Sequence, residues 1–115
     1  MYDYYEYLLF AINFLARPDV PKSFCAKAVD ETTIKHGWEP GVKRGDGQRF
    51  VIMFKTSDSR NWTDVHLGFQ TTATLDRLEP GTSYQLKMFA ESDVGKSKET
   101  DEITVGTLVH NSSGT

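Results

Sequence analysis

The sequence predicts an all-β sandwich, with seven antiparallel strands in two packed sheets. Short segments of alternating apolar and polar residues recur along the chain, most regularly at 84–90. Turn-forming residues separate these segments at intervals of roughly ten residues, which is typical of a sandwich or barrel. Helical periodicity is hard to find. Seven such segments over about ninety residues match the strand count of an immunoglobulin-like sandwich.

Each predicted strand has its inward residues two positions apart, because side chains alternate across a strand. The inward sets are Phe24, Ala26 and Ala28; Ile34, His36 and Trp38; Phe50, Ile52 and Phe54; Ala73 and Leu75; and Tyr84, Leu86, Met88 and Ala90. A short edge strand is expected over 62–69, and a last strand over 99–107 after a polar loop at 92–97. The glycine-rich, charged stretch at 42–48 reads as a loop.

A short signature carries a more specific resemblance. A leucine, a proline-glycine-threonine turn and a tyrosine follow one another in Leu78-Glu79-Pro80-Gly81-Thr82-Ser83-Tyr84, and a tryptophan shortly before a proline stands at Trp38. On these residues the chain resembles the fibronectin type III family over about 18–108. The resemblance implies that Tyr84 buries its ring while its hydroxyl bonds back to the turn backbone.

His36 departs from the family pattern, which has an aliphatic residue at this inward position. A buried histidine without a partner is costly. Three interpretations remain open: a tolerated core histidine, a local shift of register, or a core that responds to pH.

The first seventeen residues read as a separate strand-like segment. Tyr5, Tyr7, Leu9 and Ala11 repeat the spacing of the strand at 84–90. The segment is either the remnant of a similar preceding domain, which implies a tandem array, or an extension that pairs with a sheet edge. The predicted organisation is therefore 1–17, a domain at 18–108, and a flexible tail at 109–115.

Composition and charge argue against several classes of function. The net charge of −3 offers no basic surplus for nucleic acid or an anionic membrane. The apolar run at 8–12 is too short to span a bilayer and lacks the preceding positive charge of a signal peptide. The single cysteine, Cys25, cannot make an internal disulfide or a cysteine-based zinc site. The histidines His36, His66 and His110 are far apart, so we expect no catalytic residue, metal or cofactor.

Arg44-Gly45-Asp46 is the one short motif with a binding chemistry. It resembles the integrin-binding tripeptide of adhesion proteins. An exposed aspartate can complete the coordination of a cation held by a receptor, and an arginine can pair with receptor carboxylates. The alternative is an ordinary polar turn that binds nothing.

Two N-glycosylation sequons are present, Asn61-Trp62-Thr63 in a predicted loop and Asn111-Ser112-Ser113 in the tail. They favour an extracellular or cell-surface location, with a cytoplasmic one as the alternative.

The leading hypothesis is a non-catalytic module for protein-protein interaction, adhesion or spacing in a multidomain extracellular or cell-surface protein. Its partners would be neighbouring domains, a homophilic copy or an integrin-like receptor. The alternatives are a structural module of an intracellular filament-associated protein and an accessory domain of a secreted enzyme, because a fold does not fix a function.

Overall fold

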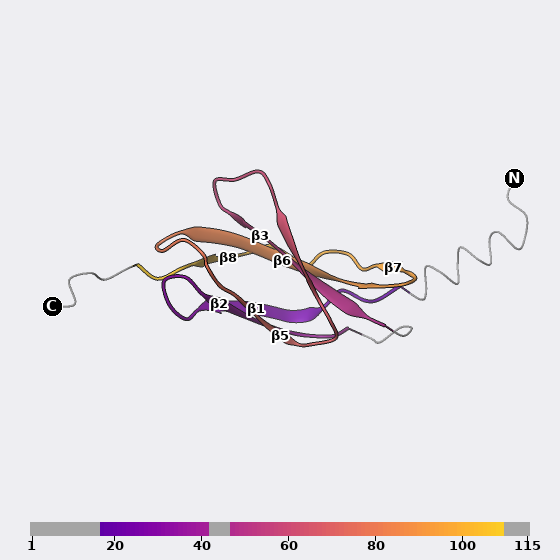
Figure 1. The fold of residues 1–115 in the computed structure, drawn as a ribbon. Helices are drawn as coiled ribbons and strands as arrows, with labels where there is room; N and C mark the ends of the chain where they lie inside the picture. Colours follow the sequence, from indigo (N-terminus) through magenta and orange to yellow (C-terminus); the bar gives the residue numbers. More distant parts are fainter. Residues whose placement is uncertain (1–16, 42–46, 110–115) are drawn as a thin grey trace, which may run out of the picture.

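The computed structural model describes residues 17–41 and 47–109, which form two antiparallel sheets stacked face to face (Figure 1). The three-stranded sheet has the order β1-β2-β5, with β1 at Lys22–Ala28, β2 at Ile34–Glu39 and β5 at Thr72–Leu75. The five-stranded sheet contains β4 at Thr63–Leu67, β3 at Arg49–Thr56 and β6 at Ser83–Ser92, with β7 at Gly95–Lys96 and β8 at Ile103–Gly106 both paired to β6. The predicted all-β sandwich is confirmed.

The inward residues predicted from alternation fill the space between the sheets. One core cluster contains Ile34, Leu75, Leu78, Tyr84 and Leu86, and a second contains Trp38, Phe50, Ile52, Met88 and Ala90. Phe24 packs against both clusters, so the half-buried inward face of β1 closes the side of the sandwich. Alternation predicted these positions because the inward side chains of a strand recur every two residues. Val51 and Phe89, a cross-strand pair on the outward face of β3 and β6, are buried as well, which alternation did not predict.

The strand count differs from the prediction because the last strand is divided. Residues 92–97 were expected to be a loop, yet β6 extends to Ser92 and β7 begins at Gly95. The expected strand at 99–107 is regular only in β8. Between β7 and β8 the side-chain hydroxyls of Ser97 and Thr100 take the place of strand carbonyls and accept hydrogen bonds from the backbone of β6, at Ala90 N (2.9 Å) and Met88 N (3.0 Å). Eight strands therefore occur among the described residues.

The tyrosine corner is present. The Tyr84 hydroxyl accepts a hydrogen bond of 2.9 Å from the backbone N–H of Glu79, and its ring is buried. The carbonyl of Glu79 in turn accepts a hydrogen bond of 2.6 Å from the hydroxyl of Thr107. Gly81 has φ +58 in this turn, a conformation that favours glycine. Within the Leu78–Tyr84 signature, Glu79, Gly81 and Tyr84 thus each have a local structural role.

The register at His36 excludes a local slip. His36 lies opposite Ala26 on one side and Ala73 on the other, in continuous ladders. The register shift in β1 falls instead between Lys22 and Cys25, where Ser23 has φ +56. His36 is therefore a core histidine held in register.

The described chain enters the sandwich at one end and leaves it at the opposite end, and we call these ends the entry pole and the exit pole (Figure 1). The entry pole comprises the described residues 17–21, 40–41, 47–48, 68–71 and 93–94. The exit pole comprises 29–33, 76–82 and 107–109. Antiparallel pairing places alternate connections at opposite poles, so the connection between β2 and β3 is at the entry pole.

Candidate functional site

Groups that could hold a metal ion and hollows that could hold a substrate are the features of the described residues that bear on catalysis. Within 17–41 and 47–109, no group of three His, Cys, Asp or Glu side chains could hold a metal ion. A hollow of about 490 Å³ opens between β1 and the chain before β8, with Pro21, Phe24 and Ile103 among its lining residues. This hollow is open, and its lining includes Ser23, Glu99 and Asp101 but neither histidine nor cysteine.

Both ends of the connection that carries Arg44, Gly45 and Asp46 are fixed by the entry pole. The tripeptide itself lies outside the described residues. Before it, Gly41 sits so close to Asp19 that an added Cβ would lie 2.6 Å from the Cβ of Asp19, which only glycine permits. After it, Gly47 has φ +74 and Gln48 is buried. The stems are therefore tied to the sandwich on both sides.

Arg49 connects this second stem to the turn between β6 and β7. Its Nη1 donates to the carbonyl of Gly47 at 3.2 Å and contacts the Asp93 carboxylate at 3.4 Å, while its Nε lies 3.8 Å from Glu91. Sequence reasoning missed this group, because Asp93 follows Arg49 by forty-four positions. Only the pairing of β3 with β6 brings the two residues together.

Buried polar atoms at the same pole lack partners. Neither the amide of Gln48 nor the indole N–H of Trp38 makes a hydrogen bond within the described structure. A buried polar group without a partner costs about 1–3 kcal/mol. The signal in the sequence was weak, because Gln48 looks like an ordinary loop residue.

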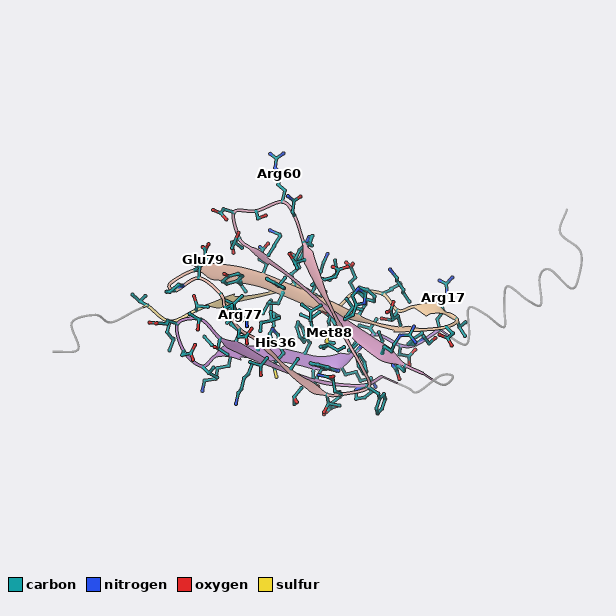
Figure 2. The ribbon with its side chains drawn as sticks, in the orientation of Figure 1. Arg17, His36, Arg60, Arg77, Glu79 and Met88 are labelled. Carbon is teal, nitrogen blue, oxygen red and sulfur yellow. The ribbon has the colours of Figure 1, made fainter. Side chains whose placement is uncertain are left out.

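His36 lies between the two core clusters, facing inward from β2 (Figure 2). Its ring stacks on Phe24, with centroids 6.1 Å apart and planes 12° apart. Burial lowers the pKa of His36 to about 4, and the backbone of Ala73 opposes this shift only in part. Neither ring nitrogen has a partner that meets the distance and angle of a full hydrogen bond. The histidine is consequently neutral at physiological pH.

Trp62 covers the outward face of the five-stranded sheet. The ammonium groups of Lys55 and Lys87 lie 5.3 Å and 4.4 Å from the centre of its ring, and Lys87 also pairs with Glu99 at 2.9 Å. Such cation-π contacts contribute about 0.5–1 kcal/mol each at exposed sites. Trp62 was predicted to begin an edge strand, but β4 begins at Thr63 and the indole serves as a cover for β3 and β6.

The remaining predicted site residues are separated from one another. Asn61 is exposed at the end of the connection between β3 and β4, far from the entry pole along the strands. Cys25 is a free, exposed thiol on the outward side of β1, as its alternation predicted. Asn111 and residues 1–16 lie outside the described residues, so the second sequon and the strand-like segment stay predictions.

These features define a class, the immunoglobulin-like β-sandwich. The model of the fibronectin type III domain matches residues 19–106. The chain belongs to the fibronectin type III family. Domains of this family in adhesion proteins are non-catalytic.

The curated relatives that the chain matches include a cell adhesion molecule, and they are much longer than the chain. The chain is 30% identical to human cell adhesion molecule DSCAML1 over 84% of its own length but only 5% of that protein. It is 29% identical to the sidekick homolog of Caenorhabditis elegans, covering 78% of the chain and 4% of the relative. The solved structure of a fibronectin type III domain of human contactin 1 is similar to this chain with a TM-score of 0.77, at 18% identity and with 86% of each chain covered. The chain thus spans a small part of the curated relatives it matches.

No helix within 17–41 or 47–109 is long and apolar enough to cross a membrane.

Proposed function

We propose that this chain is a protein-protein interaction or spacer module of a multidomain protein at the cell surface. The observation that carries the proposal is membership of the fibronectin type III family together with a curated relative that is named as a cell adhesion molecule, DSCAML1. The site supports it as well, since the described residues offer anchored loops and open faces instead of an enclosed pocket.

The location is tested on the protein in its native cells. An antibody against this domain is expected to label intact cells as strongly as permeabilised ones, because the epitope faces outward. A cytoplasmic protein serves as the permeabilisation control. Labelling only after permeabilisation would overturn the proposal and favour the intracellular filament-associated alternative.

A second, finer proposal concerns the partner. We infer that the entry pole presents Arg44-Gly45-Asp46 to an integrin-like receptor that holds a divalent cation. Two observations support it. Gly41 and Gly47 anchor the stems of the connection, and Arg49 ties the second stem to Asp93. Anchored stems limit the conformations that a loop must give up on binding, which favours affinity.

Cell attachment to the immobilised chain tests this partner. Asp46→Glu is expected to abolish attachment, because the longer side chain misplaces the carboxylate that completes the cation's coordination. A chelator of divalent cations should have the same effect on the wild type. Asp101→Ala removes another exposed carboxylate and serves as the matched control. Equal attachment by Asp46→Glu and wild type would contradict the integrin proposal and leave the module proposal intact.

A further inference from the structure

The connection between β3 and β4, residues 57–62, stands away from both sheets (Figure 1). Figure 2 shows Arg60 at its tip, pointing away from the sandwich. Asn61 follows the tip and is exposed, and Thr63 two positions later is exposed as well. An enzyme that must reach both the amide of an asparagine and the hydroxyl of the threonine would find them on an accessible projection.

The backbone of this projection is ordered by its own hydrogen bonds. Ser59 N donates to the carbonyl of Thr56 at 3.0 Å, and Asn61 N donates to the Ser59 hydroxyl at 3.1 Å. Lys55 Nζ donates to the Ser59 carbonyl at 2.9 Å. By contrast, the side-chain amide of Asn61 makes no hydrogen bond with another described residue. Modifying that amide would therefore break no contact of the fold.

Trp62, the bulky middle residue of the sequon, does not obstruct the site. Its ring is engaged by Lys87 of β6, at 4.4 Å, and by Lys55 of β3. Both lysines belong to the outward face of the five-stranded sheet, so the indole lies against that face. Asn61 remains exposed despite its large neighbour.

We propose that Asn61 carries an N-linked oligosaccharide. The inference rests on the proposed extracellular location, since the donor is a lipid-diphosphate-linked oligosaccharide of the secretory pathway. The Asn61 Nδ2 forms a bond to the anomeric carbon of the first sugar and loses one proton. The bond from that carbon to the diphosphate oxygen breaks, and the lipid diphosphate leaves with the electron pair. No oxidation or reduction is involved.

The position of the glycan gives it a structural consequence. Asn61 lies two residues before β4, which among the strands of 17–41 and 47–109 pairs with β3 alone and so forms an edge of the described sheet. Free strand edges invite pairing with another chain, and proteins protect them by charge, twist or cover. A bulky, hydrated oligosaccharide at the start of β4 covers this edge. It leaves the entry pole, at the other end of the sandwich, open for contacts.

The test uses the full chain produced in mammalian cells behind a secretion leader. Intact mass is measured before and after enzymatic removal of N-linked glycans, on secreted and on cell-retained protein alike, because glycan transfer precedes export. An Asn111→Gln background removes the second sequon. In this background we expect one glycan, and peptide mapping should locate it at Asn61. Asn61→Gln and Thr63→Ala should carry none, whereas Thr63→Ser keeps the sequon and should restore the glycan.

Folded protein with no glycan on Asn61 in that background would overturn the inference. This outcome leaves the module proposal standing, since surface labelling and cell attachment test that proposal without reference to the glycan. A glycan that persists in Asn61→Gln would likewise overturn the assignment. Edge cover is measured separately by light scattering: enzymatic removal of the Asn61 glycan should increase self-association. An unchanged monomer would overturn the protective role.

Discussion

The half of the core nearest the exit pole and the half nearest the entry pole each contain a cluster of buried apolar residues but differ in their buried polar groups. Toward the exit pole, the Tyr84 hydroxyl accepts from Glu79 N, and the Thr107 hydroxyl donates to Glu79 O and accepts from Thr82 N at 2.9 Å. Toward the entry pole, the Gln48 amide and the Trp38 indole N–H have no partner in the described structure. His36, between the two halves, resembles the entry half in this respect.

This difference in hydrogen bonding bears on how much each half contributes to the stability of the fold. Satisfied buried polar groups rigidify a core and fix its geometry, whereas unsatisfied ones reduce stability. The exit pole therefore fixes the sandwich, and the entry pole gives up stability beside the connection that we propose as a contact surface. Stability given up beside functional loops is common in natural proteins.

The largest expected effect is the response of His36 to acid. Its pKa of about 4 in the folded protein is below the ordinary value of 6.5, so the unfolded chain binds a proton that the folded protein refuses. The stability that comes from keeping His36 neutral is therefore fully present above about pH 6.5. As the pH falls toward 4, the free energy of unfolding decreases by up to about 3 kcal/mol.

Chemical denaturation at a series of pH values measures this effect. His36→Leu should remove the loss between pH 6.5 and about 4 while keeping the losses due to carboxyl groups, such as Asp30, whose pKa is lowered mainly by the backbone N–H of Thr32. Parallel curves for wild type and His36→Leu would contradict the assignment.

Removing the hydroxyl of Tyr84 should destabilise the half of the core nearest the exit pole. Tyr84→Phe leaves Glu79 N without its partner, and we expect a loss of about 1–3 kcal/mol in the free energy of unfolding. Thr107→Val removes the bond to the carbonyl of the same residue. Because both bonds hold Glu79, the double variant should be non-additive by about 0.5 kcal/mol or more. A neutral Tyr84→Phe would show that the corner contributes nothing.

The entry half should respond in the opposite direction. Gln48→Met replaces a buried, partnerless amide by an apolar side chain of similar size, and we expect a gain of about 1 kcal/mol in the free energy of unfolding. Gln85→Met, at a half-buried outward position of β6, is the matched control and should change little. A destabilised Gln48→Met would mean that the amide is satisfied in the protein.

The smallest expected effect concerns the ion pair between Arg49 and Asp93. Asp93 has 89% of its side chain exposed, so Asp93→Asn should cost less than about 1 kcal/mol. Raising the salt concentration to about 1 M should remove even this difference, because ions screen exposed charges. A difference that persists at high salt would indicate that the pair is buried on binding or in an assembly.

Much of the fold could be read from the residues themselves. Alternation placed Ile34, Trp38 and Leu86 in the core because side chains on one face of a strand recur every two residues. The Leu78–Tyr84 signature predicted a hydrogen bond within a short span of chain, and the structure has it at Glu79. An interaction within such a short span can be predicted from the sequence, because it depends little on other elements of the fold.

The features that the sequence did not predict all depend on distant partners. The division of the last strand arises because the hydroxyls of Ser97 and Thr100 meet N–H groups of β6. The link from Gly47 through Arg49 to Asp93 needs β3 beside β6, and the partnerless Gln48 needs a pole that closes over it. By itself the sequence determined which residues face inward and where the chain turns, because these follow from local geometry. Only the tertiary structure decided which buried polar groups find partners, because that depends on packing between strands far apart in the chain.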